Sequence, residues 1–348
     1  MTGRIAADFL CSVAAADRAE DPIGSGLFTS RALALEVPAP WGDSFYRADP
    51  LGTIRQRTVA MLTDHYARLR EDPPPGGPFA DGYVSVFAVA PDPGHGVPGV
   101  SRALLLERAP GPFRSFEVSE YHFPLGSERQ LDLVAALLDG RRDYSEVEAF
   151  RVPLGAEREF FVCTHGQVDI CCGKFGFPLY AEARRLEGAR VWRASHFGGH
   201  RYAPTAWEMP SGYMWGFLDA ASTAAILARS GDPAAVRPKM RGASGLEVQL
   251  QLLDRAGFEE FGWPWLAFER SGSVEPVGPG VRRWRVALAY RTPGRQAGAF
   301  RGEVEVAGDL PVIGCGSGTV DATYTVPDYR LVSVTHDRDV AFPVLATF

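Results

Sequence analysis

Apolar residues in the first part of the chain follow two different spacings, one typical of helices and one of strands. Residues 51–72 carry them at helical spacing and end at Pro73, which cannot continue a helix, so we predict a helix there. Ser127 and Gln130 have the form of a capping box before an apolar helical face that ends at Gly140. Strand-like runs occupy 83–90 and 103–107. The N-terminal region is therefore predicted to be mixed α and β.

The middle of the chain has the pattern of two strands joined through a helix. Residues 159–164 are almost continuously apolar, which predicts a buried strand with Cys163 near its carboxyl end. After a loop, Pro178 suits the first turn of a helix, Gly188 ends that helix, and 189–194 form a second strand. Two parallel strands with a crossover helix would bring their carboxyl ends side by side.

Beyond this unit the pattern becomes increasingly β-like. Residues 219–229 look helical, and they are followed by three strand-like segments at 282–290, 300–306 and 329–335, which predict a small C-terminal sheet. A chain of 348 residues exceeds what one core usually organises, so two or three domains are expected. The predicted fold class is α/β, or α+β for the chain as a whole.

Charge and cysteine content exclude several classes of partner. The net charge is −6 and Lys and Arg form no block, so no nucleic acid is expected as a partner. No stretch approaches the roughly 18 apolar residues of a membrane helix, so no membrane partner is expected and a cytoplasmic protein is predicted. Five cysteines are too few for a disulfide scaffold, which indicates a reducing compartment. Cys11 and Cys315 are expected to have no special role.

Two cysteines and two histidines are the candidate metal ligands: Cys163, Cys172, His196 and His200. The predicted strand ends would bring them together. Two thiolates with two imidazoles narrow the choice to zinc or an iron–sulfur cluster. Structural zinc sites favour cysteine pairs with two to four residues between them and histidine pairs with three to five between them. Only the histidine pair has such a spacing here. The eight residues between the cysteines are long enough to surround a cluster of two irons and two sulfides, so a cluster fits this loop better than a single ion.

These motifs carry a family resemblance. The segment CTHGQVDICCG, beginning at Cys163, followed by HFGGHRYA, beginning at His196, resembles the sucrase/ferredoxin-like family, and weaker similarity extends over about residues 8–240. The resemblance implies a thioredoxin-like ferredoxin core whose [2Fe-2S] cluster is held by Cys163, Cys172, His196 and His200, with no ligand role for Cys171. It implies three domains: 1–150 mixed α/β, 151–240 carrying the cluster, and 241–348 with a helix and a β-rich region.

The function expected on this basis is that of a [2Fe-2S] electron-transfer protein, a one-electron carrier, rather than an enzyme; an enzyme with this site would be an oxidoreductase. Imidazole ligation in Rieske centres raises the potential from about −400 mV to roughly −150 to +300 mV. A solvent-reachable imidazole N–H would couple electron uptake to proton uptake. The sequence has no nicotinamide or flavin fingerprint, so electrons would come from a separate redox partner protein.

Two other functions stay open. In a zinc-stabilised binding module the same four residues would be purely structural. In a thioredoxin-like thiol redox enzyme Cys163, or the adjacent Cys171 and Cys172, would be the redox thiols, although no Cys-x-x-Cys motif is present.

The residues beside the four candidate ligands each allow two interpretations of their role. His165 and Asp169 could hydrogen-bond the ligands, but an Asp in such a loop often makes only a local turn. Arg201 could offset cluster charge or meet an acidic partner, or it could be solvated. Four aromatic residues near the histidines are expected to be core: Trp192, Trp207, Tyr213 and Trp215.

Overall fold

The structure is a computed structural model that describes residues 9–41, 53–72, 82–315 and 324–342. Its strands form one large and one small sheet, with helices between and around them, which confirms the predicted α/β class. The large sheet has the order β10-β9-β8-β6-β7-β2-β1-β3-β4-β5, and its strands are β1 (Thr29–Glu36), β2 (Tyr83–Val89), β3 (Val100–Arg108), β4 (Phe116–Pro124), β5 (Arg151–Val152), β6 (Glu159–Cys163), β7 (Arg190–Ala194), β8 (Ala206–Met209), β9 (Tyr213–Trp215) and β10 (Met240–Ala243). The small sheet is antiparallel, with β11 (Glu269–Pro276), β12 (Arg283–Arg291), β13 (Ala297–Val312) and β14 (Tyr324–Arg338). The α-helices are α1 (Cys11–Asp17), α2 (Thr53–Glu71), α3 (Gln130–Leu138), α4 (Ile170–Ala183), α5 (Ala220–Ala228), α6 (Pro233–Val236) and α7 (Val248–Phe261).

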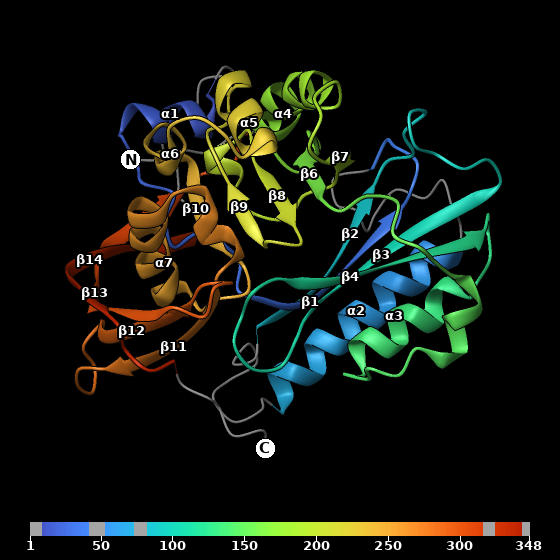
Figure 1. The fold of residues 1–348 in the computed structure, drawn as a ribbon. Helices are drawn as coiled ribbons and strands as arrows, with labels where there is room; N and C mark the ends of the chain where they lie inside the picture. The colour runs from blue at the N-terminus through green and yellow to red at the C-terminus, as the bar shows by residue number, and fades with distance from the viewer. Residues whose placement is uncertain (1–8, 42–52, 73–81, 316–323, 343–348) are drawn as a thin grey trace.

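One part of the large sheet, β1 to β4, is covered on one face by α2 and α3, which lie side by side in Figure 1. Alternation along β1 divides its apolar side chains between the two faces. Leu33 and Leu35 pack in the cluster that includes residues of α2 and α3, whereas Ala32 and Ala34 face the larger core shared with the rest of the molecule.

The other part of the large sheet is built around the predicted two-strand unit. Strands β6 and β7 are parallel and α4 connects them, as predicted. Strand β8 pairs antiparallel with β6, and β9 pairs antiparallel with β8. All five residues of β6 are buried, as expected for a strand covered on both faces. Cys163 is the last residue of β6 and His196 follows β7, so both lie at the same edge of the sheet. The two parts of the sheet meet where Val89 of β2 pairs with Ala194 of β7.

The small C-terminal sheet confirms the three predicted strands and adds β11. Helix α7 contacts β10 of the large sheet as well as β12 and β13 of the small one. A buried ion pair joins these layers, because Arg270 of β11 lies 2.8 Å from Asp254 of α7 and also donates to the hydroxyl of Tyr213 in β9 at 2.7 Å. The small sheet is thereby fixed against the central strands.

Two local predictions are wrong. The helix predicted from Pro178 to Gly188 begins at Ile170, because Asp169 caps it, and Pro178 lies inside it. It ends at Ala183, before the predicted end at Gly188. Cys172 is therefore helical and does not lie in a loop. The helix that ends before Gly140 is confirmed, but Ser127 and Gln130 form no capping box, because the Gln130 side chain bonds to Ser101 and to the Ser127 carbonyl. The helices predicted over 51–72 and 219–229 are confirmed by α2 and α5. The domain limits at 150 and 240 stay a prediction.

Candidate metal centre

Close packing of α4 on β6 brings the cysteines together. A Cβ atom on Gly176 would lie 1.9 Å from the carbonyl oxygen of Cys163, and one on Gly173 would lie 2.8 Å from the Cα of Gly166. Only glycine allows backbones to approach so closely. The start of α4 is thus pressed against the end of β6, which places Cys172 beside Cys163.

Asp169 fixes the orientation of the two adjacent cysteines. It is the N-cap of α4, and its carboxylate accepts a hydrogen bond of 2.9 Å from the backbone N–H of Cys171. Successive helical residues point about 100° apart. Cys172 therefore points toward Cys163 and His196, whereas Cys171 points toward Cys11 and away from that group.

The first cluster of donor atoms consists of Cys163, Cys172 and His196. The Nδ1 atom of His196 lies 3.7 Å from the sulfur of Cys163 and 3.6 Å from that of Cys172, and the three donor atoms lie within 4.8 Å of one another. Both thiols are buried. Burial opposes ionisation of Cys163, but hydrogen bonds from Cys172 and His196 outweigh it and hold its pKa well below the ordinary value. The hydrogen bond to Cys163 and burial raise the pKa of Cys172.

His196 is held in place by His165, which the sequence offered as a possible hydrogen-bonding neighbour. The backbone N–H of His196 donates to Nδ1 of His165 at 3.3 Å, and Nε2 of His165 lies 2.9 Å from the carbonyl oxygen of Trp41. A proton on Nε2 satisfies both contacts. His165 therefore links the histidine segment to the residues after β1 and does not join the donor cluster.

A buried arginine shapes the histidine segment. Arg241 donates hydrogen bonds to Ser25 Oγ at 3.1 Å, to the Ser25 carbonyl at 2.7 Å and to the Gly198 carbonyl at 3.1 Å. Gly199, in the left-handed region at φ +81°, lies so close that a Cβ atom on it would be 2.3 Å from Cζ of Arg241. Gly199 thus makes room for the guanidinium, and Gly198 accepts a hydrogen bond from it through its carbonyl oxygen.

Arg241 has no acidic partner among the residues that the structure describes. Burial lowers its pKa to about 10, and the nearby Tyr202, Cys163 and Cys172 work in the opposite direction. A buried cation without a carboxylate is costly unless a negative group lies near it. The thiols of the first cluster, once ionised, supply that charge.

His200 lies next to the first cluster but faces a different set of partners. Its ring centroid is 5.9 Å from that of His196. Its Nδ1 atom lies 3.0 Å from Oδ2 of Asp169 and 3.3 Å from the sulfur of Cys11. Asp169 therefore both caps α4 and contacts a candidate ligand, so the two readings that the sequence left open both apply.

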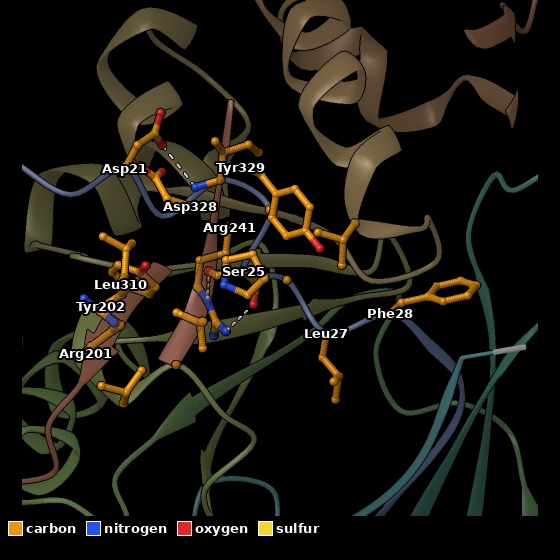
Figure 2. Close-up of a pocket in the computed structure, with 18 of the residues that line it drawn as sticks. Asp21, Ser25, Leu27, Phe28, Arg201, Tyr202, Arg241, Leu310, Asp328 and Tyr329 are labelled. Carbon is orange, nitrogen blue, oxygen red and sulfur yellow. Dashed lines mark hydrogen bonds between the residues drawn. The ribbon is translucent and has the colours of Figure 1, made fainter. Parts of the chain in front are cut away.

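A pocket of about 600 Å³ opens beside His200. Its wall includes the segment 21–28, the residues from Gly199 to Tyr202, Arg241, and residues of β14. Figure 2 shows Arg241 and Ser25 joined in this wall, with Asp328 and Tyr329 of β14 nearby. His200 thus lines the pocket, whereas the thiols of Cys163 and Cys172 are buried.

Of the four predicted ligands, Cys163, Cys172 and His196 form one cluster, and His200 lies beside it with contacts of its own. Arg201 is buried, pairs with Glu20 and donates to the Pro311 carbonyl at 3.2 Å, so it is not solvated. The four aromatic residues near the histidines are buried core residues, as predicted: Trp192, Trp207, Tyr213 and Trp215.

Sequence reasoning missed a second cluster of donors, formed by Cys11, Asp169, Cys171 and Cys315. All four are buried, and their donor atoms lie within 4.8 Å of one another. Cys11 and Cys315 are separated by 304 positions, yet the backbone N–H of Cys11 lies 3.0 Å from the sulfur of Cys315. Nothing in the spacing of these cysteines along the sequence indicates the cluster, although it includes every cysteine outside the first one.

Fold and site define an α/β protein with a buried centre of thiols and imidazoles at the edge of a mixed sheet. The sequence model of the sucrase/ferredoxin-like family matches residues 79–242, which include both motifs, so the resemblance is confirmed for this part of the chain. No curated protein and no solved structure matches the chain significantly. Within the described ranges, no helix has both the length and the apolar character needed to span a membrane.

Proposed function

We propose that Cys163, Cys172, His196 and His200 hold a [2Fe-2S] cluster and that the protein is a one-electron carrier. The observation that carries the proposal is the enclosed group of two thiols and one imidazole, with a second imidazole beside it, inside a sucrase/ferredoxin-like segment. The cysteines are potential metal ligands of the kind that soft and borderline metals prefer.

The position of His200 favours a cluster over a single ion bound by all four residues. Around one tetrahedral ion every pair of donor atoms lies roughly 3.3–3.8 Å apart. His200 is not part of the group of atoms within 4.8 Å of one another, although Cys163, Cys172 and His196 are. A [2Fe-2S] cluster has two protein ligands on each iron, so its four ligands extend beyond the reach of a single ion, as these four do.

The surroundings of the four residues suit a centre that gains negative charge. When bound, a [2Fe-2S] cluster supplies reversible one-electron chemistry, at a potential raised by imidazole ligation. Arg241, buried and without an acidic partner among the described residues, stabilises the additional negative charge. Asp169 lies 3.0 Å from Nδ1 of His200 and orients that ring. Nε2 is then the ring nitrogen that would bind the metal.

The pocket supports electron exchange on the imidazole side. The side chain of His200 is 11% exposed, whereas Cys163 and Cys172 are almost completely buried. A redox partner protein would therefore approach past His200. The strand order β9-β8-β6-β7, with β6 and β7 parallel and joined by α4, supports the thioredoxin-like core that the resemblance implies. The expected proton coupling and the limits of the cluster domain stay predictions.

The test is anaerobic purification followed by iron and acid-labile sulfide analysis and EPR of the dithionite-reduced protein. Each of Cys163→Ser, Cys172→Ser, His196→Ala and His200→Ala should lose or change the signal. Cys171→Ser is the matched control, because its thiol points to the other cluster. Colourless wild-type protein without iron or sulfide would refute the proposal. Loss of signal in Cys171→Ser but not in Cys172→Ser would assign the ligand role to Cys171 in place of Cys172.

One observation favours zinc as the second candidate. The distances of 3.6 and 3.7 Å from His196 Nδ1 to the two sulfurs are close to the roughly 3.5 Å expected around one zinc ion. Such a site would stabilise a binding module without carrying electrons. Stoichiometric zinc that is lost in Cys163→Ser, in protein that lacks visible absorption, would establish this alternative.

A further inference from the structure

We propose that Cys11, Cys171, Cys315 and Asp169 form a second metal site, a closed tetrahedral site for a zinc ion. The proposal does not rest on the [2Fe-2S] cluster, because none of its four residues belongs to the first donor cluster. It assigns a role to the three cysteines that the proposed function leaves unused.

The spacing of the donor atoms is that of ligands around a single ion. With zinc–sulfur bonds of about 2.3 Å and zinc–oxygen bonds of about 2.1 Å, tetrahedral geometry puts two sulfurs about 3.8 Å apart and a sulfur and an oxygen about 3.6 Å apart. The sulfur of Cys171 lies 3.7 Å from that of Cys11 and 3.3 Å from that of Cys315. The sulfur of Cys11 lies 3.5 and 3.6 Å from the two carboxylate oxygens of Asp169.

The site is built from three segments that are distant in sequence. Cys11 is the first residue of α1, Cys171 lies in the first turn of α4, and Cys315 follows β13. The four side chains are enclosed, Cys315 being the most exposed at 8%. A closed set of four protein ligands without access for substrate is typical of a structural zinc site, not of a catalytic one.

The polar atoms around the site are arranged for negatively charged ligands. Asp169 accepts backbone N–H groups of Cys171 and Cys315, each at 2.9 Å. The backbone N–H of Cys11 points to the sulfur of Cys315 at 3.0 Å. Binding of zinc would release the thiol protons to solvent.

Three buried thiols beside a buried carboxylate do not make a stable apolar core. Burial of a carboxylate costs free energy unless it is paired or binds a metal. Asp169 has an imidazole and two N–H groups as partners, but its two oxygens also face the sulfur of Cys11. A divalent cation among these four groups would offset half of their negative charge once the thiols ionise.

The experiment measures zinc in the full-length protein by elemental analysis, alongside its iron. Wild type should contain about one zinc per chain, and both Cys11→Ser and Cys315→Ser should lose most of it. In Cys315→Ser, iron and visible absorption should stay unchanged. Cys163→Ser is the control and should keep its zinc even if it loses iron. The two readouts separate failure of this site from failure of the cluster.

A second measurement covers variants that fail to fold. Folded wild-type protein is stripped with a chelator and titrated with Co²⁺, which should produce thiolate-to-cobalt charge-transfer absorption that saturates at about one ion and disappears when Zn²⁺ is added. Either of two results would overturn the proposal: folded wild type that contains no zinc and shows no such absorption, or zinc that is lost from Cys163→Ser but kept in Cys11→Ser. A disulfide between any two of Cys11, Cys171 and Cys315 in freshly isolated protein would also overturn it.

Discussion

Replacement of Gly199 by alanine tests how the histidine segment is held. The backbone of Gly199 is left-handed, and the new Cβ atom would lie 2.3 Å from Cζ of Arg241, with two guanidinium nitrogens almost as near. Gly198 is the matched control, because it is also left-handed, at φ +91°, but a Cβ atom there has nothing within 4 Å.

The expected losses of stability differ between the two variants. A left-handed conformation costs an alanine about 1–2 kcal/mol, which is the whole expected loss for Gly198→Ala. Gly199→Ala must in addition displace Arg241 from hydrogen bonds to Ser25 and Gly198. Loss of one hydrogen bond to a charged group costs about 1.5–3 kcal/mol. The free energy of unfolding should thus fall by about 3–5 kcal/mol in Gly199→Ala.

Denaturant unfolding of the two variants and wild type, followed by fluorescence, measures this difference. Combining Gly199→Ala with Arg241→Gln should cost less than the sum of the single changes, because both remove the same contact. Equal losses for Gly198→Ala and Gly199→Ala, or full additivity in the double variant, would refute the reasoning.

Three further predictions follow from other contacts. Arg241→Gln should lower the midpoint potential of the proposed cluster, on the order of 60 mV, since a buried positive charge favours the reduced form; an unchanged potential in a redox titration would contradict this. Glu120 has its pKa lowered to about 2, because hydrogen bonds from Arg190 and His122 outweigh burial. Its contribution of up to about 3 kcal/mol is present at neutral pH and lost as the pH falls from about 4.5 to 2, so Glu120→Gln should flatten that part of the stability profile measured by denaturation. Gly176→Ala should push α4 from β6 and cost at least 1–3 kcal/mol, measured as the denaturation midpoint.

The sequence predicts those parts of the fold that depend on local pattern. Apolar spacing is sufficient for β6, β7 and three of the four strands of the small sheet, and two parallel strands joined by a helix must place Cys163 and His196 at one edge. The start of α4 could not be predicted from apolar spacing. Pro178 suggested a helix start, whereas the capping carboxylate of Asp169, nine residues earlier, sets it.

The second donor cluster could not be predicted, because it depends on long-range packing. Cys11, Cys171 and Cys315 stand in unrelated local sequences, and no spacing rule connects positions 304 residues apart. Likewise, the sequence offered no reason to connect Arg241 with the histidine motif. Only the packing of β10 beside this motif, where Arg241 donates to the Gly198 carbonyl, brings them into contact.

Several supports of the centre come from outside the stretch shared with the family. Trp41 holds His165, Ser25 holds Arg241, and Cys11 touches His200, yet all three precede residue 79, where the family match begins. A fragment trimmed to 79–242 would retain every proposed cluster ligand and lose this scaffold. Studies of the isolated family region would therefore describe a looser pocket than the one the whole polypeptide builds.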